Sequence, residues 1–191
     1  MHRADDAGIP NAVVKWAGDR DAFTREVCDA VEQAGASAMI LAGFMRILGP
    51  DAVRRFPDRI VNIHPSLLPS FPGLEAQHQA LDHGVKLTGC TVHFVNEECD
   101  EGPIILQAVV PVFADDSEQT LAARILKQEH RIYPRAIQLY AENRLHVVGR
   151  KVVVDGSPKD ENQTLIQPAH PGGTARAHGH SVNGQFAMLG Q

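Results

Sequence analysis

The feature that most constrains the fold is an amphipathic helical pattern followed directly by a continuous apolar run. Apolar residues recur at helical spacing over residues 21–34, between charged residues, and Gly35 ends the pattern. Residues 38–42 are then apolar throughout, so we expect residues 37–42 to form a strand buried on both faces, and residues 59–63 to form a second buried strand. Helices that alternate with buried strands predict an α/β domain with a mostly parallel, Rossmann-like sheet.

The alternation continues to about residue 155. We expect further helices at residues 50–56, 75–82 and from Ser117 onward, strands at residues 88–95 and 104–112, and a C-terminal hairpin at residues 145–154. Pro134 lies inside the last helix and should kink or break it. From Gly156, glycine, proline and polar residues replace the periodic pattern. We therefore expect a domain over residues 1–155 and a disordered tail over residues 156–191.

Composition argues against several classes of function. A formal net charge of −5 disfavours a nucleic-acid binder, which usually has a basic face. No apolar run reaches the ~20 residues that a membrane helix needs, and the opening residues do not form a signal peptide. Cys28, Cys90 and Cys99 form no C-x-x-C pair, and their odd number favours reduced thiols in a cytoplasmic protein.

Asn62 and His64 end the second buried strand. Two positions apart on a strand, they lie on one face, and α/β sheets bind ligands beyond the carboxyl ends of their strands. An amide beside an imidazole can hold a carbonyl oxygen, stabilise the charge that develops on it and move protons. Because N-x-H is short and common, spacing alone favours the plainer interpretation, two strand-end residues satisfied by backbone contacts.

Asp100 precedes the later strand that begins near residue 104. Its carboxylate could orient His64 and favour the protonated imidazole, although a turn acid is the more ordinary reading of this position. We interpret His93 as a structural strand histidine. A metal site made of His64, His93 and Asp100 is a weaker alternative, because Asn62 is a poor ligand and no His-x-x-x-His or paired-cysteine spacing is present. We therefore expect no metal.

Five segments in a fixed order are together more specific than any one alone. They are Gly43-Phe44-Met45-Arg46, Asn62-Ile63-His64-Pro65-Ser66-Leu67-Leu68-Pro69, Gly89-Cys90-Thr91-Val92-His93-Phe94-Val95, Asp100-x-Gly102-Pro103-Ile104-Ile105 and Gln128-Glu129-His130-x-x-Tyr133-Pro134. In these segments the chain resembles the phosphoribosylglycinamide formyltransferases, the folate-dependent enzymes of purine synthesis. The resemblance runs over about residues 3–154.

The resemblance implies a reaction and a set of site residues. The amine of glycinamide ribonucleotide would attack the formyl carbon of 10-formyltetrahydrofolate, the cosubstrate. Asn62 and protonated His64 would stabilise the oxyanion, and Asp100 would orient His64. The implied folate-binding residues are Arg20, Met45, Arg46, Ile47, Leu48, Asn62, Asn96, Glu97, Glu98, Cys99 and Asp100. The implied ribonucleotide-binding residues are Lys127, Gln128 and Glu129, with Glu129 toward the ribose.

The chain departs from the family pattern at its start. The family begins with a strand and a Gly/Ser/Asn-rich loop that grips the substrate phosphate, and this sequence shows neither. We therefore expect an N-terminally incomplete domain, a sheet with an unpaired edge, and weak ribonucleotide binding by residues 1–191 alone.

Related activities remain as alternatives. Formyltetrahydrofolate hydrolases share the Asn, His and Asp set, but they continue with His-Ser-Phe where this chain has Pro65-Ser66-Leu67. The transferase that acts on methionyl-tRNA needs a basic extension, which this chain lacks. An inactive folate-binding fragment is the third alternative. The partners expected are small-molecule substrates, with no nucleic acid and no membrane, for a cytoplasmic monomer or homodimer.

Overall fold

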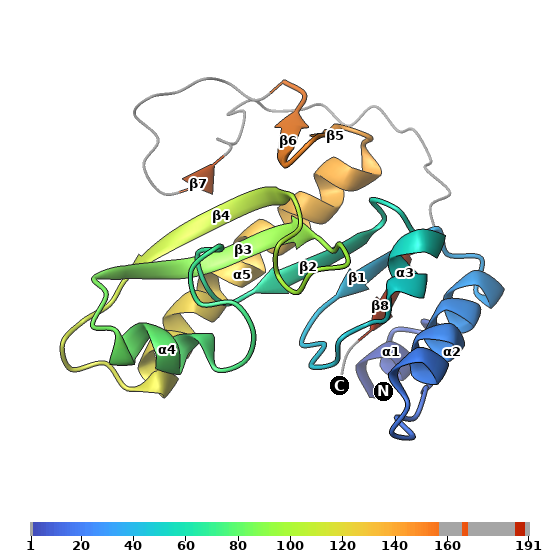
Figure 1. The fold of residues 1–191 in the computed structure, drawn as a ribbon, viewed down its shortest axis with the longest axis horizontal. Helices are drawn as coiled ribbons and strands as arrows, with labels where there is room; N and C mark the ends of the chain where they lie inside the picture. Colours follow the sequence, from blue (N-terminus) through green and yellow to red (C-terminus); the bar gives the residue numbers. More distant parts are fainter. Residues whose placement is uncertain (1, 157–165, 168–185, 190–191) are drawn as a thin grey trace.

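A computed structural model describes residues 2–156, 166–167 and 186–189. In this part of the chain one open sheet has helices on both faces (Figure 1). The helices are α1 (His2–Asp6), α2 (Arg20–Gln33), α3 (Pro50–Arg55), α4 (Ala76–Asp82) and α5 (Glu118–Ala141). The strands are β1 (Ala38–Leu41), β2 (Ile60–His64), β3 (Leu87–Phe94), β4 (Ile104–Pro111), β5 (Leu145–Val148), β6 (Lys151–Val154), β7 (Ile166–Gln167) and β8 (Phe186–Leu189).

The sheet is mixed, with strand order β5-β6-β4-β3-β2-β1-β8 and β7 paired to β4. β1 is parallel to β2 and to β8, and β4 is parallel to β6, whereas β3 is antiparallel to both of its neighbours. β5 and β6 form the predicted C-terminal hairpin. The predicted α/β fold class is confirmed, and the predicted elements before residue 155 lie within two residues of the observed bounds.

Apolar side chains form a packed layer on each face of the sheet. On one face Ile40 and Val61 pack in a cluster with buried residues of α5, which lies behind the sheet in Figure 1. On the other face Met39 and Ile60 pack with residues of α2 and α3. This division follows from the two-residue period of a strand.

Capping side chains set the starts of the two longest helices. Asp19 accepts hydrogen bonds from the backbone N–H of Asp21 (2.8 Å) and of Ala22 (2.9 Å). Ser117 and Thr120 form a capping box at the start of α5. These caps satisfy N–H groups that have no partner within the helix.

Pro134 does not break α5, which runs as one helix from Glu118 to Ala141. The predicted break is therefore wrong. Buried Ile132 and Ala136 on either side of the proline hold the helix against the sheet. The Tyr133 hydroxyl also donates to the carbonyls of Leu41 and Val61. These contacts offset the one helical hydrogen bond that proline removes.

The edge of β1 is paired in the structure. β8 lies parallel to β1 over four residue pairs, from Ala38 with Phe186 to Leu41 with Leu189. The predicted unpaired edge is therefore not observed. Residues 157–165, 168–185 and 190–191 lie outside the described residues, so the disorder expected for the tail stays a prediction. Within the described segments, no helix is both long and apolar enough to cross a membrane.

Candidate active site

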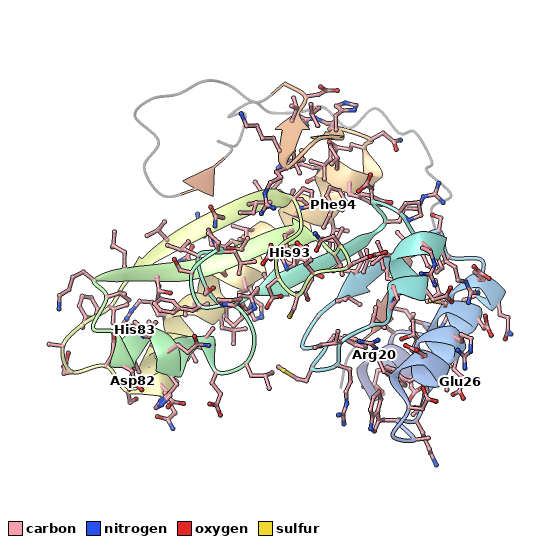
Figure 2. The ribbon with its side chains drawn as sticks, viewed as in Figure 1. Arg20, Glu26, Asp82, His83, His93 and Phe94 are labelled. Carbon is pink, nitrogen blue, oxygen red and sulfur yellow. The ribbon has the colours of Figure 1, made fainter. Side chains whose placement is uncertain are left out.

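The register of β2 on β3 gathers polar side chains on one face. Asn62 lies opposite His93, and His64 lies opposite Thr91. Because alternate strand residues share a face, these four side chains lie together, and the residues between them face α5. Figure 2 shows His93 on β3, in the middle of the sheet.

The loop that follows His64, residues 65–73, is tied to the same face. The Thr91 hydroxyl donates to the Ser66 carbonyl (2.7 Å) and accepts from the Leu68 N–H (3.0 Å). The Gln107 amide donates to the Thr91 hydroxyl and to the Leu68 carbonyl, both at 3.0 Å. These hydrogen bonds hold the loop against the sheet.

His64 lies between two acceptor oxygens. Its Nδ1 is 3.4 Å from Asp100 Oδ2, and its Nε2 donates to the Phe71 carbonyl at 2.8 Å. The side chains of His64 and Asp100 are only 6% and 12% exposed. An imidazolium offers an N–H to both oxygens, so the protonated ring satisfies this arrangement fully.

Asp100 is held by two loops. Its backbone is in the left-handed region (φ 57°), and its Oδ2 accepts from the Gly73 N–H at 2.8 Å. One loop precedes β4, and the other follows His64. The structure thus brings Asn62, His64 and Asp100 together from three separate sequence positions.

His93 also belongs to this group, and the interpretation of it as merely structural omitted its contacts. Its Nδ1 donates to the Phe94 carbonyl (2.9 Å), and its Nε2 lies 3.2 Å from the Asn62 amide nitrogen and 3.8 Å from Asp100 Oδ1. Burial lowers the pKa of His93 and so favours the neutral ring. Nε2 then accepts from Asn62 and orients that amide. The antiparallel register of β2 on β3 is the signal that would have found it.

The burial of His93 leads to a prediction of how the free energy of unfolding depends on pH. Its pKa is lowered in the folded chain, so below its ordinary value of 6.5 the unfolded chain takes up a proton that the folded chain resists. The contribution of His93 to unfolding free energy is therefore constant above pH 6.5 and falls as pH drops below it. We expect His93→Gln to lose less stability than the wild type between pH 7.5 and pH 5.

Urea denaturation at several pH values measures this difference. His78 is a control of opposite sign, because Glu118 and then Asp82 raise its pKa. Its stabilising effect is present below 6.5 and is lost at higher pH, so His78→Gln should lose more stability than the wild type on acidification. Equal losses in the wild type and His93→Gln would contradict the expected role of burial.

The predicted folate segment, residues 43–48, leaves the carboxyl end of β1. Phe44 and Leu48 are partly buried against the α2 layer. Met45 and Ile47 are 61% and 59% exposed. The segment therefore presents apolar side chains to solvent beside the end of β2.

One arginine lies within this segment, and another lies at the start of α2. Arg20 lies at the start of α2 (Figure 2) and pairs with Asp21 at 3.3 Å. The Arg46 guanidinium lies 4.7 Å from the centre of the Trp16 ring. Both charges are at the surface.

The loop from Asn96 to Cys99 contributes an unsatisfied acceptor. Asn96 Oδ1 is buried and accepts no hydrogen bond from any described residue. Glu97, Glu98 and Cys99 are exposed. A buried acceptor without a partner is costly to the folded chain.

The predicted ribonucleotide residues lie on the other face of the sheet. Lys127 is exposed, and Gln128 and Glu129 are half-buried on α5. Burial raises the pKa of Glu129. Burial, and then the charge of Glu129, raises the pKa of Cys90 to about 12, which places Glu129 near the α5 face of β3. No described contact joins these three residues to His64 or Asp100.

A cavity of about 240 Å³ adjoins Asp100. Its lining is Leu68, Pro69, Pro72, Asp100, Glu101, Gly102, Ile104 and Arg150. Within the described part of the chain, no group of three His, Cys, Asp or Glu side chains is arranged to hold a metal ion. All three cysteines are free, and Cys28 and Cys90 are buried.

Known proteins resemble this chain in sequence and in fold. The sequence profile of the family described as Formyl transferase matches residues 1–137. Phosphoribosylglycinamide formyltransferase of Escherichia coli (strain K12) is 46% identical over 158 residues, which cover 82% of this chain and 74% of that protein.

Solved structures show the same likeness. Glycinamide ribonucleotide transformylase 1 from Symbiobacterium toebii has a TM-score of 0.78 and 52% identity, over 80% of this chain and 73% of that one. A formyltetrahydrofolate deformylase from Pseudomonas syringae pv. tomato str. DC3000 has a TM-score of 0.76 and 36% identity, over 80% of this chain and 52% of that one.

Proposed function

This chain belongs to the formyl transferase family, and we propose that it transfers the formyl group of 10-formyltetrahydrofolate to the amine of glycinamide ribonucleotide in purine synthesis. The observation that carries the proposal is the arrangement of Asn62, His64 and Asp100 at the carboxyl end of β2. We further propose that residues 1–155 form the formyltransferase domain.

Asn62 supplies the first donor to the formyl oxygen. One N–H of its amide is engaged by His93 at 3.2 Å, which fixes the plane of the amide. The second N–H then donates to the oxygen as it becomes negative in the tetrahedral intermediate. A donor fixed before the reaction lowers the barrier by about 3 kcal/mol in comparable oxyanion sites.

His64 supplies the second donor and moves the proton. In the structure its Nε2 donates to the Phe71 carbonyl, so a substrate oxygen must exchange for that carbonyl. The amine attacks the formyl carbon, and a C–N bond forms. The bond from that carbon to folate N10 then breaks, and N10 takes the proton that the amine gives up, with His64 in the transfer. Asp100 holds the ring throughout.

The predicted folate residues fit a pterin ring. The exposed side chains of Met45 and Ile47 offer apolar contact to the ring. On the α5 side, the half-buried Glu129 carboxylate would accept from the ribose hydroxyls of the second substrate. The amine of the ribonucleotide would then reach the formyl-transfer site across the end of β2.

Hydrolysis of the formyl folate is the second candidate, favoured by the likeness to a deformylase. The transferase is the stronger candidate, because the identity to the transformylases is higher, at 46% and 52%. An assay that follows tetrahydrofolate release with and without glycinamide ribonucleotide tests the proposal. Release that needs the ribonucleotide supports transfer, and release of formate without it supports hydrolysis.

Asp100→Asn tests the positioning of His64. The amide keeps the shape of the side chain but removes the charge that faces Nδ1 at 3.4 Å. We expect kcat for formyl transfer to fall on the order of 100-fold, as when an acid–base group is misdirected. Glu101→Gln, the neighbouring acid, is the control. Equal activity of the two variants would show that Asp100 does not orient His64.

A further inference from the structure

The Trp16 ring contacts Arg46, a residue of the proposed folate site. The Arg46 guanidinium carbon is 4.7 Å from the centre of the Trp16 ring, within the range of a cation–π contact. Both side chains are at the surface, since Trp16 is 39% exposed and Arg46 is exposed. A surface arginine otherwise samples many rotamers, so this contact restricts Arg46.

Trp16 is itself anchored to the core. Its ring meets Phe23 of α2 edge to face at 5.4 Å, and Phe23 stacks on Phe44 at 6.3 Å. Phe23 is buried. The side chains of Phe44 and Arg46 therefore rest on one set of rings, which holds the segment that leaves β1 at two points.

The charge of Arg46 stays available in this arrangement. Among the ion pairs of the described residues none includes Arg46, whereas Arg20 is paired with Asp21. A guanidinium that stacks on a ring keeps its in-plane N–H donors free for a carboxylate. Folates carry carboxylates on their glutamate.

We propose that Trp16 is a positioning residue that holds the Arg46 guanidinium toward the carboxylates of the folate cosubstrate. The proposal rests on the proposed function, because it assigns Arg46 to the folate side of the same site. Trp16 acts through Arg46 and touches no reacting atom. Its effect therefore falls on KM for the formyl folate and not on kcat.

A double-mutant cycle on the whole chain tests this role. Trp16→Leu keeps an apolar side chain but removes the aromatic face. We expect it to raise KM for 10-formyltetrahydrofolate about two- to fivefold, the effect of an exposed cation–π contact, with kcat unchanged. Arg46→Ala should raise KM at least as much. In the double variant Trp16→Leu should add nothing further, and Trp16→Phe should restore part of the affinity.

Phe113→Leu is the matched control, because Arg124 lies 4.4 Å from the Phe113 ring in a similar contact far along the chain. It should leave KM for the formyl folate unchanged. Additive effects of Trp16→Leu and Arg46→Ala would overturn the proposal, as would a fall in kcat without a change in KM.

If Trp16→Leu does not fold, the fluorescence of Trp16 in the other variants provides an independent test. Trp16 is the single tryptophan of the chain, so its emission reports this site alone. Arg46→Ala should change that emission and weaken its response to tetrahydrofolate. An unchanged emission and response would refute the proposal. If the wild type lacks formyl transfer, the proposed function fails, while this titration still tests Trp16 through binding.

Discussion

Replacing His64 with alanine is expected to abolish formyl transfer, with kcat lower by on the order of 1,000-fold or more. In the proposed mechanism the imidazole is both a donor to the developing oxyanion and the group that moves the proton to folate N10. Its removal also leaves Asp100 without the ring that lies 3.4 Å away. Because folate binding uses other residues, the affinity for tetrahydrofolate should change little.

Single-turnover assays and calorimetry on the same preparation measure the two effects. His146→Ala is the control, since His146 pairs with Asp155 on the C-terminal hairpin. It should retain wild-type turnover. Turnover of His64→Ala within tenfold of the wild type would remove His64 from the mechanism.

The second large effect that we expect is a loss of stability in the variant Gly102→Ala. A Cβ built at Gly102 would lie 1.7 Å from the Phe94 carbonyl oxygen and 2.8 Å from its carbon. The obstruction is backbone, so no side chain can move to relieve it. The Phe94 N–H also donates to the Pro103 carbonyl at 2.9 Å, which holds the two segments together.

We expect Gly102→Ala to lower the free energy of unfolding by about 3 kcal/mol or more. It should also reduce activity, because Asp100 lies two residues earlier in the displaced segment. Urea denaturation measures the loss. Gly149→Asn is the control, since Gly149 has a φ of 61°, which asparagine tolerates, and no atom lies within 4 Å of its Cβ position. If Gly102→Ala had the same urea midpoint as the wild type, the backbone at Gly102 and Phe94 would be able to move apart at little cost.

Much of the fold could be predicted from local patterns. The period of the apolar residues gave α2, β1 and β2 to within two residues. Asn62 and His64 could be placed on one face at a strand end from their spacing alone. The break at Pro134 was wrong, because packing of its neighbours against the sheet outweighs a local helix breaker.

What escaped prediction depends on contacts between distant segments. The role of His93 required the register that sets it opposite Asn62. The Trp16–Arg46 contact joins residues 30 positions apart through the packing of α2, and no sequence pattern indicates it. The unsatisfied oxygen of Asn96 is likewise a property of burial in the folded chain.

The pairing of β2 with β3 has a consequence for how the chain reaches its native state. A slip of one residue would turn Asn62 and His64 toward α5 and place Ile63 on the site face. The amide and the imidazole would then lie in an apolar layer, where polar groups without partners cost several kcal/mol. Misaligned molecules are therefore disfavoured by the same two side chains that we propose for the chemistry, so the site either forms in register or does not form.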